Sequence, residues 1–188
     1  YMLRENNFLF ANLSIGNRAP QVTDLYRIQS KQVPGGADSE ELESFEIGFR
    51  GVSNIGLEYE IVCYAMQKEN YFFSDSQGFN VENGVTKHNG REFNYYKAFG
   101  DNFEISGSLS FADHEYDFNH SPNKIVKGNT IDSAPKELAN TRFAYLTSSG
   151  VKFELEWIRV GDYPINESNA HTYEGHDIFN LRLNGDLT

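Results

Sequence analysis

Asn-Ile-Gly-Leu-Glu-Tyr-Glu-Ile-Val-Cys-Tyr-Ala-Met-Gln, residues 54–67, is the stretch that decides the fold class. Because side chains alternate between the two faces of a strand, every second residue of this stretch belongs to one face. One face includes Glu58, Glu60, Tyr64 and Met66, and the other carries no charge. The uncharged face consists of Ile55, Leu57, Tyr59, Ile61, Cys63 and Ala65. The stretch therefore predicts a long β-strand with one apolar and one polar face.

The same alternation recurs along the chain. In residues 44–51, Phe45, Ile47 and Phe49 alternate with Glu46 and Arg50. No segment has the 3.6-residue period of an amphipathic helix, so we predict an all-β protein, an antiparallel up-and-down meander of about eight strands. The expected strands are residues 5–14, 44–51, 54–67, 84–97, 102–116, 139–147, 151–160 and 176–186.

The connections between these strands alternate between long and short. All five prolines fall in long connections, where they interrupt no ladder hydrogen bond. Outer-membrane β-barrels have short turns at one end and long loops at the other, whereas a soluble sandwich has no reason to do so. The pattern therefore favours a membrane barrel, with its apolar face toward lipid and its polar face toward the lumen. The long connections are residues 15–41, 68–83, 117–138 and 161–175, and the short ones are 51–53, 98–101 and 148–150.

Composition excludes several classes of partner and anchor. The chain has 188 residues, with 16 Lys and Arg against 27 Asp and Glu and a formal charge of −11, so it lacks the basic surface of a nucleic-acid-binding protein. The longest apolar run, residues 61–66, is far shorter than the about 20 residues that a transmembrane helix needs. A single cysteine, Cys63, excludes an internal disulfide.

Short motifs along nearly the whole chain resemble, in order, those of the TonB-dependent outer-membrane receptors. Residues 16–26 resemble the family's GxRAP and (E/D)LY stretch, and residues 40–51 its ExSxxxExGxRG strand. Residues 83–92 are similar to its NxG and GxE strand, residues 134–140 to its AP and AN element, and residues 161–173 to the loop that follows. The motif residues with an expected structural role are Gly16, Arg18, Pro20, Leu25, Tyr26, Glu46, Gly48, Arg50, Gly51, Asn83, Gly90, Glu92 and Pro135.

This resemblance implies a segment of a 22-stranded transmembrane barrel in the bacterial outer membrane. The family's plug domain, and the short box that TonB contacts, have no counterpart in the sequence, and residues 184–188 lack a terminal aromatic. We therefore expect residues 1–188 to be one partial barrel domain, without the plug and the closing strands. The implied partners are outer-membrane lipid, and the TonB complex and plug, whose contact segments lie outside this chain.

The function implied by the resemblance is TonB-energised uptake of a scarce ligand. A ferric siderophore is favoured because the iron-receptor branch is the one resembled, while haem, cobalamin and oligosaccharides stay open. Aromatic rings stack on flat ligands and arginine pairs with anions, although some rings will belong to membrane-interface belts and Arg18, Arg50 and Arg91 can pair with lumen carboxylates instead. The candidate ligand-binding residues are Arg18, Tyr26, Tyr71, Phe72, Phe73, Phe79, Tyr163 and Tyr173.

Motifs for catalysis or metal binding are lacking. Residues 106–108 do not form a nucleophile elbow, and the acidic run at 38–43 is more typical of a solvated loop than of a calcium site. We therefore expect no enzyme, no metal site and no cofactor. The histidines that fall in no recognised ligand spacing are His88, His114, His120, His171 and His176.

Two alternatives stay open at this point. The strand count and up-down order would also permit a complete eight-stranded outer-membrane barrel, in which the first and eighth strands pair. The aromatic content of 14% would also suit a soluble β-domain that binds carbohydrate.

Overall fold

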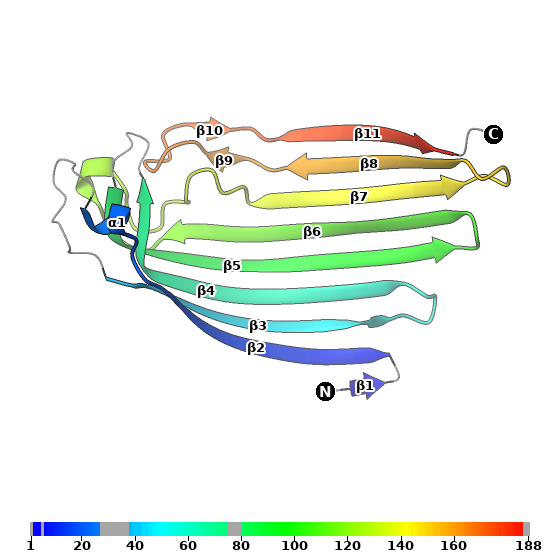
Figure 1. Cartoon of the computed structure of the whole chain (residues 1–188), viewed down its shortest axis with the longest axis horizontal. Coiled ribbons are helices and arrows are strands. Elements are labelled where there is room, and N and C mark those ends of the chain that lie inside the picture. The colour runs from blue at the N-terminus through cyan, green and yellow to red at the C-terminus, as the bar shows by residue number, and fades with distance from the viewer. Residues whose placement is uncertain (1, 5, 27–37, 75–79, 186–188) are drawn as a thin grey trace.

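The computed structural model describes residues 2–4, 6–26, 38–74 and 80–185 (Figure 1). Two short helices, α1 (Val22–Tyr26) and the 3-10 helix η1 (Ser121–Asn123), lie in connections. No helix in these ranges is long and apolar enough to span a membrane. The strands, in chain order, are β1 (Met2–Arg4), β2 (Asn7–Arg18), β3 (Glu40–Val52), β4 (Glu58–Ser74), β5 (Asn80–Phe99), β6 (Phe103–Tyr116), β7 (Glu137–Leu146), β8 (Lys152–Val160), β9 (Tyr163–Pro164), β10 (Thr172–Tyr173) and β11 (His176–Asn184).

Nine strands form one curved antiparallel sheet in the order β1-β2-β3-β4-β5-β6-β7-β8-β11, and β9 pairs only with β10 (Figure 1). The predicted all-β meander is thus confirmed. β1 and β11 are the edges of the sheet, and no ladder between described residues joins β11 to β2. The sheet is therefore open, and the pairing that a complete eight-stranded barrel requires is not made by these residues.

The two faces of the sheet differ as the alternation predicts. Arg50, Glu60, Asn94, Ser108 and Asn140 oppose one another in one row across β3 to β7, on what we call the polar face. The neighbouring row, which lies on the other or apolar face, runs through Phe49, Ile61, Phe93 and Leu109. Because the sheet is a single layer, apolar side chains stay uncovered, and the exposed fractions of Leu13, Ile15 and Leu181 are 71%, 69% and 70%. An apolar surface of this extent is typical of a membrane-facing protein.

One predicted connection is wrong. Residues 68–83 were expected to form a long loop, but β4 continues to Ser74 and β5 begins at Asn80. Register shifts between Lys68 and Phe73 break the strict alternation there, and Asn83 has a positive φ of 58°. A β-bulge of this kind adds a residue without ending the ladder, so the strand continues after its period is lost.

The two ends of the sheet differ in their connections (Figure 1). At the turn end, Ser53 N–H donates to Leu57 O at 2.8 Å and Thr147 N–H to Val151 O at 2.9 Å, so these connections are tight. At the loop end, residues 117–136 are joined to residues 161–175, because Asn169 Nδ2 donates to Thr130 O at 2.8 Å. A small buried core of Phe72, Val81, Tyr116 and Ile125 lies there.

Candidate ligand-binding face

A dense charge network occupies the polar face of β7, β8 and β11. Glu156, whose side chain is 5% exposed, accepts from Arg142 Nη2 at 2.8 Å and from Arg182 Nη2 at 2.7 Å. Asn140 Nδ2 and Asn180 Nδ2 donate to the same carboxylate at 3.0 Å and 3.1 Å. Four donors on one carboxylate satisfy its oxygens without water. We call Glu156, these two arginines and these two asparagines the glutamate network.

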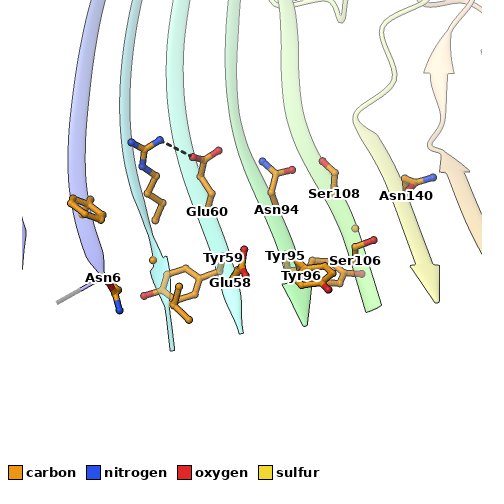
Figure 2. Close-up of a pocket in the computed structure, with 15 residues that line it drawn as sticks. Asn6, Glu58, Tyr59, Glu60, Asn94, Tyr95, Tyr96, Ser106, Ser108 and Asn140 are labelled. Atoms are coloured by element: carbon orange, nitrogen blue, oxygen red, sulfur yellow. Dashed lines mark ion pairs between the residues drawn. The ribbon is translucent and has the colours of Figure 1, made fainter. Parts of the chain in front are cut away.

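A shallow groove of about 680 Å³ lies beside this network, at the turn end of β3 to β7. Figure 2 shows Glu60, Asn94, Ser108 and Asn140 side by side on its wall. Arg50 Nη1 lies 3.9 Å from the Glu60 carboxylate. Aromatic and apolar side chains such as Phe8, Val52 and Tyr59 also line the groove, so it offers ring contacts to a ligand as well as hydrogen bonds.

Two motif glycines make room for aromatic rings of the neighbouring strand. A Cβ on Gly48 would lie 2.1 Å from the ring of Phe10, which is directly opposite in the register. A Cβ on Gly90 would lie 2.4 Å from the ring of Tyr64, again its direct partner. Cross-strand packing of an aromatic ring over glycine fixes register. The motif is therefore explained by packing at these two positions.

At the loop end, the polar face also carries a cluster of packed aromatic rings. Tyr71 and Phe73 stack with ring centroids 5.4 Å apart, and Phe73 lies 5.9 Å from Tyr116 and 6.4 Å from Phe118. We call these four residues the loop-end cluster. Lys68 Nζ stands 4.4 Å from the centre of the Tyr71 ring. The cluster combines rings that can stack with a cation that can meet an anion.

The structure places the candidates Tyr71 and Phe73 together but directs Phe72 elsewhere. Phe72 is only 8% exposed, and its backbone N–H donates to Glu40 Oε1 at 2.9 Å. Arg18 Nε donates to the other oxygen of Glu40 at 2.6 Å. Arg18 therefore fastens β2 to β3 through a carboxylate, which is the structural alternative that the sequence left open.

The remaining candidates lie apart from the cluster. Tyr163 and Tyr173 face each other across β9 and β10, with centroids 5.1 Å apart, and Tyr26 ends α1 with 62% of its surface exposed. Phe79 lies outside the described residues. Arg91 opposes Cys63 and Phe111 on the apolar face, so it is directed away from the surface where a ligand or plug was expected.

Sequence reasoning missed part of the loop-end cluster and one histidine pair. Tyr116 and Phe118 continue the period of β6, which is the signal that would have placed them beside Phe73. His88 and His114 are 26 residues apart and meet only because β5 and β6 pair in this register. Among the described residues, no group of three or more His, Cys, Asp or Glu side chains is arranged to hold a metal.

Comparison with known proteins identifies the fold family. The model of the family described as "TonB dependent receptor-like, beta-barrel" matches residues 1–188. This chain belongs to that family. TonB-dependent receptor barrels lie in the bacterial outer membrane, so the receptor segment described here is an outer-membrane protein. No curated protein sequence is significantly similar to it.

Solved structures of TonB-dependent receptors share the fold at low sequence identity. The ferric citrate transporter FecA has a TM-score of 0.78 and 18% identity, covering 97% of this chain and 29% of its own. The ferric yersiniabactin uptake receptor FyuA from Yersinia pestis has a TM-score of 0.77 and 13% identity, covering 97% and 28%. The siderophore receptor PiuA from Acinetobacter baumannii has a TM-score of 0.76 and 16% identity, covering 96% and 28%. The receptor segment thus spans less than a third of the length of these proteins, which are receptors and transporters.

Proposed function

We propose that this chain is part of a receptor that takes up a ferric siderophore with energy supplied through TonB. In this proposal residues 1–188 are one part of a larger barrel, the apolar face meets lipid, and the polar face lines the lumen around a plug. The observation that carries the proposal is the cluster of packed aromatic rings at the loop end of the polar face, with Lys68 beside it. A ligand arriving from outside meets the loop end first in such a barrel.

The loop-end cluster supplies what a flat, anionic iron complex needs. Tyr71 and Phe73 are half-buried, and Lys68 provides positive charge beside the Tyr71 ring. This local charge matters because the whole chain carries −11, which would otherwise repel an anion. In this proposal the protein binds the ligand and controls its passage through the barrel. We therefore expect the ligand to leave chemically unchanged, without an enzymatic step.

Binding and uptake of iron complexes by the full-length protein test this proposal. Tyr71→Ala and Phe73→Ala should each weaken siderophore binding roughly tenfold, which corresponds to about 1.4 kcal/mol. Phe179→Ala on the apolar face, 69% exposed, is the matched control and should bind normally. Uptake, but not binding, should stop when TonB is deleted. If iron complexes, haem and cobalamin all fail to bind while an oligosaccharide does, the ligand class is wrong.

A further inference from the structure

We propose that His88 and His114 form a two-nitrogen site on the polar face for a transition-metal ion of borderline softness, Cu(II) in preference to Zn(II). This goes beyond the uptake of a ferric siderophore, in which iron is held by the hard oxygen donors of its carrier. Imidazole nitrogen suits copper and zinc, and copper binds more tightly than zinc to a given set of nitrogen ligands.

The geometry of the pair is close to that of a chelate. The two residues are direct partners in the β5–β6 register, and their Nδ1 atoms are 2.8 Å apart. Metal–nitrogen bonds of about 2.0–2.1 Å place two nitrogens of one ion roughly 2.9–3.4 Å apart, depending on the angle between the bonds. Small rotations of two side chains would therefore admit a metal ion between the rings.

A neighbouring hydroxyl fixes one ring in the orientation that coordination requires. Thr86 Oγ1 lies 2.9 Å from His88 Nε2, which is the remaining ring nitrogen. When Nε2–H donates to this hydroxyl, Nδ1 of His88 keeps a lone pair directed at His114. Histidine ligands in metal sites are held by such partners on their second nitrogen, and losing the partner weakens metal binding.

A methionine stands in the same row. Met66 is the direct partner of His88 on β4, so Met66, His88 and His114 form one row across three strands of the polar face. Thioether sulfur favours Cu(I), so this row offers ligands to both oxidation states of copper. Lys68 in the adjacent row stands over the Tyr71 ring and adds positive charge nearby, which limits the affinity. All three residues of the row are half-buried, so water or a carrier can complete the coordination from the lumen.

Copper titration of the full-length protein in detergent tests the site. We expect one Cu(II) whose electron paramagnetic resonance spectrum shows coupling to two imidazole nitrogens, and Zn(II) should compete for it. His88→Asn and His114→Asn should each weaken Cu(II) binding at least tenfold. His176→Asn is the matched control, because this histidine bonds to Tyr173 at 2.8 Å instead, and it should bind copper normally.

Two further variants keep the test independent of folding and of iron uptake. Thr86→Val leaves both imidazoles in place and should still weaken binding roughly tenfold. Met66→Leu should lower Cu(I) affinity and leave Cu(II) affinity unchanged. Unchanged copper binding in both histidine variants, or a spectrum without nitrogen coupling, overturns the site. Loss of ferric siderophore binding with intact copper binding would instead contradict the proposed function alone.

Discussion

Different interactions stabilise the two ends of the polar face. At the turn end, the glutamate network satisfies a carboxylate with two arginines that remain 43% and 47% exposed. At the loop end, Tyr116 is 2% exposed, touches two other rings and donates to Asp132 Oδ1 at 2.6 Å. The first arrangement depends on charge and tolerates water, while the second depends on excluding water. The loop end is thus a small globular core attached to a membrane sheet.

Removing the Tyr116 ring should produce the largest effect. Tyr116→Ala leaves a cavity among Phe73 and Phe118, and large aromatic-to-alanine changes in a core cost about 3–5 kcal/mol. The loss should be local to the loop end. Hydrogen exchange of the Tyr116 and Gly128 amides, which bond to Asn129 O and Tyr116 O, measures it directly.

Tyr116→Phe is the matched control for this variant. It keeps the ring and removes only the hydrogen bond to Asp132, so we expect a loss of about 1–3 kcal/mol. If Tyr116→Ala costs less than Tyr116→Phe, the loop end is not held by aromatic packing, and the contrast between the two ends fails.

Breaking the glutamate network should have a smaller effect that depends on salt. Glu156→Ala removes one of the two carboxylates that Arg142 and Arg182 share and leaves Glu154 alone between two cations, so the urea midpoint of unfolding in detergent should fall. High salt should reduce the difference from the native protein, because it screens the repulsion between the two cations. Glu60→Ala removes a looser pair, 3.9 Å from Arg50, and should leave the midpoint unchanged. A salt-independent loss in Glu156→Ala would contradict an electrostatic role.

The smallest effect concerns Asp117, which joins the loop end to β5. Hydrogen bonds from Lys127 and Lys87, each at 2.7 Å, hold the pKa of this carboxyl below its ordinary value of 3.8. A lowered pKa contributes stability that is present above the ordinary value and lost as pH falls through the lowered one. Asp117→Asn should therefore lower stability slightly at neutral pH and flatten the acid limb of the stability curve, so that its difference from the native protein disappears at low pH. A difference that grows as the pH falls would refute this assignment.

Most strands of the sheet could be predicted because one face of the sheet is apolar and the other is polar, so that residue types alternate along each strand. In residues 45–49 of β3 and residues 153–157 of β8, every second residue is apolar. The part of the β4–β5 hairpin at the loop end could not be predicted from alternation. Beyond Lys68 the register shifts, and Phe72 is buried by contacts within the loop end rather than by membrane. Where a strand no longer has an apolar environment on one face and a polar one on the other, apolar and polar residues no longer alternate in its sequence.

In the candidate site, only contacts between residues of the same strand could be predicted from the sequence. Tyr71 and Phe73 share a face because they are two residues apart, so the sequence contains that contact. The pairing of Arg18 with Glu40, and of His88 with His114, depends on the register between strands. A one-residue slip would move every side chain of a strand to the other face, and no local pattern encodes the choice between partners.

The rings that lie over Gly48 and Gly90 bear on how this protein can evolve. Phe10 and Tyr64 occupy the space where any larger side chain at the glycines would start. A larger side chain at position 48 therefore requires the ring at position 10 to move or to be replaced by a smaller one, and the same holds for positions 90 and 64. In a set of related sequences, each ring and its glycine should be inherited or lost as a pair.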